Sequence, residues 1–210
     1  MITNTELEYK GDLYPSKITE FKKETDSVYF YTDNSVILKI TVLRDSMLRF
    51  RYTTKGYFSK DFSYAIDKTQ SHGYNFLEVT EEKKHYAIKT SKVICTIQKE
   101  DLRIAITDLS GNVILEDEKG FHWEESYHFG GNIVKMSKAS RDGESFYGLG
   151  DKASHANLKG KRVENWATDQ YAFHKDQEPL YKVVPFYIGL HHKEAYGIFF
   201  DNTFRTCFDF

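Results

Sequence analysis

The residues of this chain best suited to chemistry lie in a short run where aromatic rings stand beside an acid. Trp166 and Asp169 are three residues apart in the run Asn-Trp-Ala-Thr-Asp at 165–169. An exposed carboxylate accepts hydrogen bonds from two neighbouring sugar hydroxyls, and such charge-assisted bonds are roughly twice as strong as neutral ones. An adjacent ring supplies an apolar platform for the C–H groups of a sugar. The pairing indicates carbohydrate binding, although local sequence alone favours Asp169 capping a turn and Trp166 packing inward.

Two glycines flank Leu149 in the run Phe-Tyr-Gly-Leu-Gly-Asp-Lys at 146–152. Glycines at this spacing permit a tight turn or a close approach of two backbones. A nucleotide-binding loop is excluded, because the run has neither the third glycine nor the following helical pattern that such a loop needs. The two glycines are therefore predicted to have a conformational role, in a tight turn or where two backbones approach closely.

The titratable residues form no recognisable catalytic or metal-binding motif. His191 and His192 are adjacent, which is not metal-ligand spacing, and we expect both to be exposed in a hairpin turn. His155 and His174 lie in a long loop and can touch a ligand, but nothing nominates either as a catalyst. The sequence lacks a Gly-x-Ser-x-Gly nucleophile elbow. We expect no metal and no other cofactor.

Composition excludes several classes of function. The net charge is −2 and acids are interspersed with bases, so the basic stripe that nucleic acid requires is missing. No apolar run approaches the roughly 20 residues that span a bilayer, and the N-terminus lacks a secretory pattern. Cys95 and Cys207 have no CxxC partner, which argues against a disulfide scaffold. The expected setting is cytoplasmic, without nucleic acid or membrane; a secreted protein trimmed of its signal is the alternative.

Strand patterns dominate the chain, and helix patterns are nearly absent. Even-numbered positions from Val36 to Val42 are apolar, as one buried face of a strand requires. Short strands of this kind, separated by turn signals such as Gly-Gly-Asn at 130–132, indicate two antiparallel sheets packed face to face. The predicted fold is all-β, a large antiparallel sandwich over 26–210 that follows a lead-in segment at 1–25.

The segment 150–185 is the exception to this alternation. It contains Pro179 and Pro185 and is predicted to be a long loop, which in a compact domain is usually functional or covers a partner surface. Two strand-like runs, 186–190 and 195–200, follow it and are predicted to form a hairpin. Pro185 is acceptable at the entrance of a strand, because a first residue needs no ladder donor.

Taken in order, four segments resemble the N-terminal domain of glycoside hydrolase family 31, the α-glucosidase and α-xylosidase family. Each segment is weak alone, but their order is specific, whereas residues 1–140 match the family only in β character. Trp-Ala-Thr-Asp is a loose version of the family's Asn-Thr-Asp-type segment and retains the acid. The matching segments are 146–152, 165–169, 179–186, and 195–202 followed by Arg205.

The resemblance implies a galactose-mutarotase-like β-sandwich ahead of a catalytic (β/α)8 barrel, which is expected after residue 210. In that family the nucleophile and the acid/base are aspartates of the barrel, so this chain is expected to hold no catalytic residue and to be inactive alone. The family's N-terminal domain extends a loop over the active-site mouth, where an aspartate binds sugar hydroxyls. By motif position that residue is Asp169, with Trp166 and Tyr171 as further substrate-binding candidates.

The function implied by the resemblance is that of the N-terminal domain of a retaining, α-glucosidase-like glycosidase. The parent is expected to hydrolyse terminal α-linked glucose or related sugars through a covalent glycosyl–enzyme intermediate. Its expected partners are an α-linked oligosaccharide or α-glucoside substrate and the downstream barrel of the same polypeptide. The alternatives are a free-standing carbohydrate-binding module, an aldose-epimerase-like domain with a His and a Glu in a cleft, and a purely structural domain.

Overall fold

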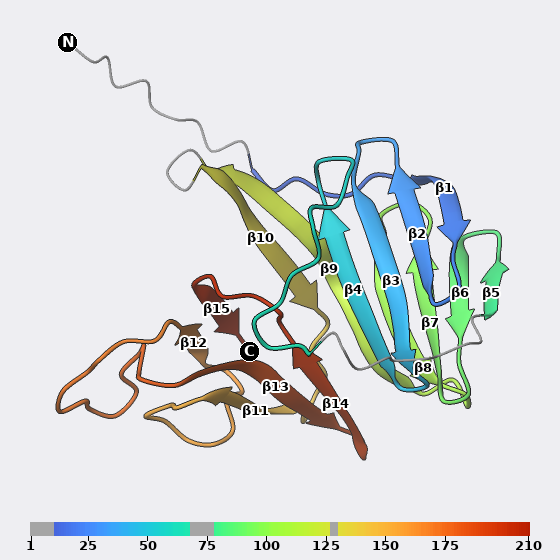
Figure 1. Ribbon diagram of the computed structural model, residues 1–210. Helices are drawn as coiled ribbons and strands as arrows, with labels where there is room; N and C mark the ends of the chain where they lie inside the picture. The colour runs from blue at the N-terminus through green and yellow to red at the C-terminus, as the bar shows by residue number, and fades with distance from the viewer. Residues whose placement is uncertain (1–10, 68–77, 127–129) are drawn as a thin grey trace, which may run out of the picture. The chain divides into compact units, whose positions relative to one another are not determined.

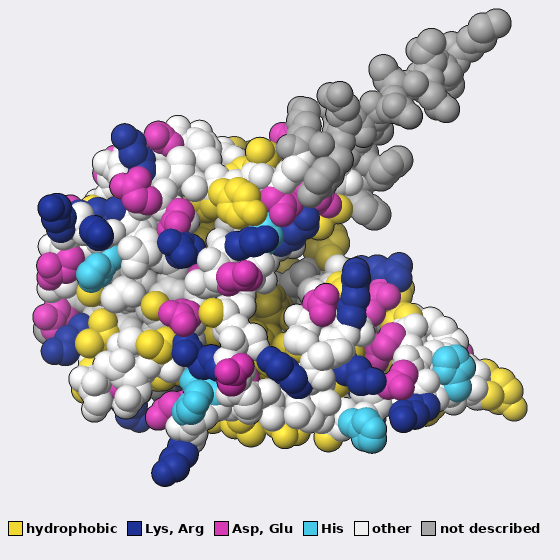
Figure 2. Space-filling view, turned by 180° about the vertical axis from the view of Figure 1, so that it is seen from behind, with side chains coloured by type: hydrophobic (Ala, Val, Ile, Leu, Met, Phe, Trp, Pro, Cys, Tyr) yellow, Lys and Arg dark blue, Asp and Glu magenta, His cyan; other side chains and the backbone are white. Residues whose placement is uncertain are grey.

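The computed structural model describes residues 11–67, 78–126 and 130–210, and in these ranges it contains strands and no helix (Figure 1). The predicted all-β class is confirmed. The chain divides into two compact units: unit 1 comprises residues 1–60 and 71–139, and unit 2 comprises 61–70 and 140–210. No helix among the described residues is long and apolar enough to cross a membrane. On the face drawn in Figure 2, acidic side chains are interspersed with basic ones.

Unit 1 is a sandwich of two antiparallel sheets. In both sheets, strands that follow one another in the sequence are neighbours. The first sheet contains β1 (Ile18–Lys23), β2 (Ser27–Thr32), β3 (Ile37–Arg44) and β4 (Met47–Thr53). The second contains β5 (Glu78–Glu81), β6 (His85–Lys89), β7 (Val93–Gln98), β8 (Ile104–Asp108), β9 (Val113–Ser126) and β10 (Gly131–Lys138).

The core of unit 1 lies between these sheets. Alternate residues of a strand point to opposite faces, so Leu38 and Ile40 are fully buried, and both belong to the same apolar cluster as Ile88 and Ile97 of the second sheet. Cys95 is also fully buried there, as a small apolar residue would be. The alternation predicted for 36–42 is confirmed. β1 falls within the predicted lead-in segment, and the division into 1–25 and 26–210 stays a prediction.

Unit 2 contains two smaller sheets. β11 (Ser145–Gly150), β13 (Val183–His191) and β14 (Glu194–Phe199) form one, in the order β11-β13-β14. β12 (Arg162–Asn165) pairs with β15 (Thr206–Asp209) in the other. Their shared cluster of buried residues is rich in rings: Phe146, Leu149, Leu158, Val163, Tyr187 and Phe208.

The predicted hairpin is confirmed, but one of its histidines differs from the prediction. β13 and β14 are joined by a two-residue turn, His192 and Lys193, whose φ angles are 45° and 72°. His192 is exposed, as predicted. His191 is buried, because it is the last residue of β13 and its ring lies 6.0 Å from that of Tyr196. The prediction that both histidines are exposed turn residues is therefore wrong for His191.

The glycines at 148 and 150 allow β11 to approach β13 closely, as predicted. A Cβ on Gly150 would lie 2.3 Å from the carbonyl oxygen of Lys182, and the φ of Gly150 is +84°. The pairing register shifts between Gly148 and Gly150, opposite the stretch of β13 that contains Pro185. Pro185 therefore lies inside β13 rather than at its entrance, and the irregular ladder explains how a residue without an N–H fits there.

Candidate functional site

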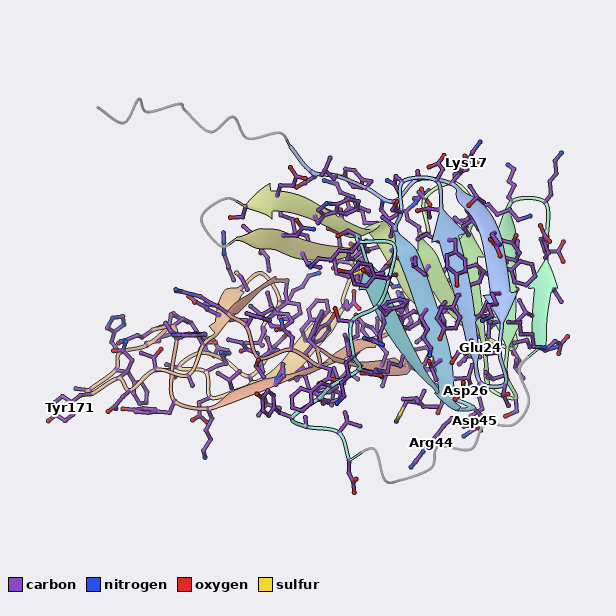
Figure 3. All side chains as sticks on the ribbon, turned by 45° about the horizontal axis from the view of Figure 1, so that its top comes forward. Lys17, Glu24, Asp26, Arg44, Asp45 and Tyr171 are labelled. Atoms are coloured by element: carbon purple, nitrogen blue, oxygen red, sulfur yellow. The ribbon has the colours of Figure 1, made fainter. Side chains whose placement is uncertain are left out.

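The candidate site lies in unit 2, on the segment between β12 and β13, which we call the 166–182 loop. β12 falls within the predicted 150–185 segment and divides it, so the 166–182 loop is its longer part without a strand. Figure 3 shows Tyr171 at the outer end of this loop. The loop carries all three residues predicted to bind substrate: Trp166, Asp169 and Tyr171.

These three residues are exposed. Trp166 is 47% exposed and Tyr171 is 96% exposed, and Asp169 also lies at the surface. The side chains of Trp166 and Asp169 make no hydrogen bond or ion pair with any other described residue. The structure therefore differs from the alternative favoured by local sequence, in which Asp169 caps a turn and Trp166 packs inward. The arrangement leaves a carboxylate and two rings free to contact a ligand.

Two further exposed rings on the same loop escaped the sequence analysis. Phe173 and Tyr181 are both about half exposed, and their ring centroids lie 6.4 Å apart at an interplanar angle of 70°. The Tyr181 hydroxyl donates a hydrogen bond to the backbone oxygen of Gln170, which ties this ring to the outer part of the loop. The sequence feature that could have pointed to these two rings is the high aromatic content of the segment, but composition does not distinguish exposed rings from buried ones.

The loop folds back on itself through hydrogen bonds between its two arms. The amide of Thr168 donates to the oxygen of Leu180 at 3.0 Å, and Leu180 is buried. The Gln177 side chain donates to that of Gln170 at 2.9 Å. Asp176, with a φ of 61°, helps the chain reverse direction. These bonds restrict the backbone conformations of the loop that carries the exposed rings.

A buried polar cluster lies where the loop joins the sheets. The Lys152 ammonium donates to the backbone oxygen of Glu164 at 2.9 Å, to the Asn165 side-chain oxygen at 3.3 Å and to the Glu178 carboxylate at 3.0 Å. The Lys152 side chain is 6% exposed and the Glu178 side chain 17%. Asn165 is also buried. This cluster was not predicted, because its members are far apart in the sequence.

A buried acid of unit 2, Glu144, is held by different partners. It accepts a hydrogen bond from the Tyr196 hydroxyl at 2.7 Å and one from the backbone amide of Arg141 at 2.9 Å. Burial raises the pKa of Tyr196, and the hydrogen bond to Glu144 raises it further. Burial likewise raises the pKa of Tyr187. The two tyrosines therefore keep their protons, and their rings pack in the interior cluster of unit 2.

The two histidines predicted to lie in the long loop do not build a site. His155 and His174 are exposed, and the Nδ1 atom of His174 lies 3.0 Å from the backbone oxygen of Lys175. Among residues 11–67, 78–126 and 130–210, no group of three or more His, Cys, Asp or Glu side chains is placed to hold a metal ion. The groups that the described residues present at this site are one carboxylate and several rings, which suit recognition of a ligand.

Comparison with known proteins gives a consistent result. Residues 37–209 match the family described as the glycosyl hydrolase 31 N-terminal galactose mutarotase-like domain. Over 188 residues the chain is 29% identical to α-glucosidase 2 of Bacillus thermoamyloliquefaciens, and the match covers 89% of this chain and 23% of that relative.

Solved structures agree with this match. A dextranase of Flavobacterium johnsoniae in complex with isomaltotriose superposes with a TM-score of 0.80 at 25% identity, covering 94% of this chain and 24% of the dextranase chain. An α-xylosidase of Xanthomonas citri shares the fold, with a TM-score of 0.72 at 22% identity, covering 89% of this chain and 19% of the other. The chain thus spans about a quarter of the length of the α-glucosidase and the dextranase.

Proposed function

This chain belongs to the glycosyl hydrolase 31 N-terminal galactose mutarotase-like domain family, and we propose that it is the N-terminal β-domain of an α-glucosidase-like glycosidase. The proposed parent hydrolyses terminal α-linked glucose or related sugars with retention of configuration, using aspartates of a barrel domain outside this chain. In this proposal the chain supports the barrel and contributes contacts at the rim of the substrate site. The matches to an α-glucosidase and a dextranase support this choice of reaction.

The observation that carries the proposal is that one short loop carries the exposed carboxylate of Asp169 and the exposed rings of Trp166 and Tyr171. A carboxylate that no other described residue engages is available to accept hydrogen bonds from two sugar hydroxyls. Neighbouring rings offer apolar faces for sugar C–H groups. The loop's cross-bridging hydrogen bonds reduce the conformational freedom that it would lose on binding, which favours affinity.

The alternatives differ in what the chain does alone. The same four exposed rings favour a free-standing carbohydrate-binding module. Such a module predicts that the 210 residues bind isomaltotriose with a Kd near ~10 μM. A contact at the rim of the substrate site predicts roughly millimolar affinity instead. An aldose epimerase requires a His and a Glu that a sugar can reach. His191 and Glu144 both contact Tyr196, but both are buried, so they do not meet this requirement.

The proposal is tested by replacing Asp169 in the gene product that contains this chain. We expect Asp169→Ala to lower kcat/KM for an aryl α-glucoside by about tenfold to a hundredfold, since a hydrogen bond to a charged group contributes roughly 1.5–3 kcal/mol. Asp142→Ala, at another exposed acid of unit 2, is the matched control and should leave kcat/KM unchanged.

Two outcomes would contradict the proposal. Equal kcat/KM in Asp169→Ala and the unaltered enzyme would mean that the loop makes no substrate contact, as in a purely structural domain. Turnover of the aryl α-glucoside by the 210-residue chain alone would mean that the catalytic residues lie within it.

A further inference from the structure

Lys152 joins three separate parts of unit 2 through one ammonium group. Lys152 lies two residues after the end of β11, whereas two of its acceptors, the Glu164 oxygen and the Asn165 side chain, belong to the end of β12. Its third acceptor, the Glu178 carboxylate, belongs to the returning arm of the 166–182 loop. Lys152 therefore contacts the residues that immediately precede the loop and a residue near its end.

The bonding of Lys152 is complete. An ammonium group has three donors and no acceptor, and here three acceptors lie within 3.3 Å of Nζ. A buried ion pair adds little net stability, because desolvation offsets the attraction between the charges, but its geometric demands can favour one conformation over others. The burial of Lys152 and Glu178 thus points to a role in holding shape.

The side-chain amide of Asn165 is oriented by Lys152. Its side-chain nitrogen is buried and finds no acceptor among the described residues, whereas its side-chain oxygen accepts from Lys152. Because an ammonium group can only donate, it holds the oxygen of the amide toward Nζ. Asn165 is followed directly by Trp166, so the orientation of Asn165 influences how the chain enters the loop.

We propose that Lys152 is the positioning residue of the 166–182 loop. By holding Asn165 and Glu178 around one ammonium group, it sets the separation of the two loop arms and thereby the presentation of Trp166 and Asp169 to an α-linked glucan. The choice of ligand rests on the proposed function, but the control of loop geometry does not. Lys152 itself makes no contact with sugar in this proposal and takes no part in the chemistry.

The first arm of the test compares Lys152→Met with Lys161→Met in the 210-residue chain. Lys161 pairs with Asp176 of the same loop at 3.0 Å, but both side chains are exposed, so it is the matched control. Loop order is followed by hydrogen exchange of the Thr168 amide, which donates to Leu180. We expect exchange about tenfold faster in Lys152→Met and changed less than about twofold in Lys161→Met, since local opening governs such amides.

A double variant separates positioning from folding. Lys152→Met alone leaves the Glu178 charge buried without its partner, which destabilises the unit whatever the role of the loop. Lys152→Met with Glu178→Leu removes that charge and should recover most of the lost Tm, but it does not restore the bridge that Lys152 makes between Asn165 and Glu178. We therefore expect the Thr168 amide to exchange about tenfold faster than in the unaltered chain even where Tm has recovered. Glu178→Gln keeps an acceptor and should preserve slow exchange.

The second arm measures binding. Titration with isomaltotriose is followed by tryptophan fluorescence, to which the exposed Trp166 responds and the buried Trp123 does not. We expect Kd to rise about tenfold in the double variant. No response from the unaltered chain at ~10 mM isomaltotriose would contradict the proposed function alone, because the exchange arm does not depend on sugar. Thr168 exchange in the double variant equal to that of the unaltered chain would overturn the role of Lys152.

Discussion

Unit 1 and unit 2 are both built from strands, yet different side chains stabilise them. Of the twelve largest fully buried side chains among the described residues, only Leu149 and Leu158 belong to unit 2. The interior of unit 1 is mostly aliphatic and lies between two sheets. The interior of unit 2 is a small ring-rich cluster accompanied by buried polar groups, which include Glu144, Lys152 and Asn165.

This difference bears on how the position of a single loop can be set in each unit. Apolar burial is strong but non-directional, so it stabilises a sandwich without setting the position of any one loop. Hydrogen bonds to buried charges are directional and costly to leave unmade, so they specify geometry. Both units contain a largely buried ion pair, Lys138–Asp117 in unit 1 and Lys152–Glu178 in unit 2. The candidate binding residues lie in the unit that has the smaller apolar core, and we interpret the position of their loop as depending more on a few directional bonds, such as those of Lys152.

The largest effect is expected from truncating the aliphatic core of unit 1. Ile40→Ala should lower the free energy of unfolding by about 4 kcal/mol, because it removes buried methyl groups and leaves a cavity. Urea denaturation measured by the fluorescence of Trp123, in a Trp166→Phe background, reports unit 1. A loss below ~1 kcal/mol would contradict the view that aliphatic packing dominates this unit.

A somewhat smaller effect is expected where β11 meets β13. Gly150→Ala should destabilise unit 2 by roughly 3 kcal/mol, since the new Cβ would collide with the Lys182 carbonyl in addition to straining a positive φ. Gly143→Ala is the control, because its φ is +73° but nothing lies near the added atom; it should cost about 1 kcal/mol. Exchange of the Tyr187 amide measures both, and equal effects would show that the close approach is unimportant.

The two cysteines are expected to differ in their response to pH and to reagents. Burial raises the pKa of Cys95 from an ordinary 9.0 to about 12, whereas Cys207 is exposed. Between these pH values the unfolded Cys95 thiol is ionised and the folded one is not, so the folded state binds more protons and stability falls as pH rises. Cys95→Ala should reduce this fall in urea denaturation above pH 9.

The two cysteines are also expected to differ in their reactivity at neutral pH. In the native chain we expect a thiol-specific colorimetric reagent to modify Cys207 rapidly and Cys95 only after unfolding, since the thiolate must be accessible to react. Rapid modification of both thiols in folded protein would mean that the core of unit 1 opens readily.

The smallest effect is expected from an exposed ion pair. Lys161→Met should leave the thermal stability of unit 2 almost unchanged, because solvent screens the contact of Lys161 with Asp176. Thermal unfolding followed by circular dichroism provides the measurement. If Lys161→Met lowered the thermal stability of unit 2 as much as Lys152→Met does, burial of an ion pair would not matter for its contribution to this unit.

The sequence by itself determined the features that depend on neighbouring residues. Alternation predicted the buried face at 36–42, the spacing of two apolar runs predicted the β13–β14 hairpin, and Gly150 predicted a close backbone approach. The order of four short segments also identified the family. These features leave a local signal because strand periodicity, turn chemistry and glycine conformation act within a few residues of one another.

Only the tertiary structure decided which residues far apart in the sequence meet. The pairing of β12 with β15, the burial of His191 against Tyr196 and the bridge from Lys152 to Glu178 have no local pattern. The exposure of Trp166 is of the same kind, because local sequence favoured the opposite. Burial and ion pairing depend on which chain segments the fold places around a side chain, and that is a property of the assembled sheets rather than of any short stretch of residues.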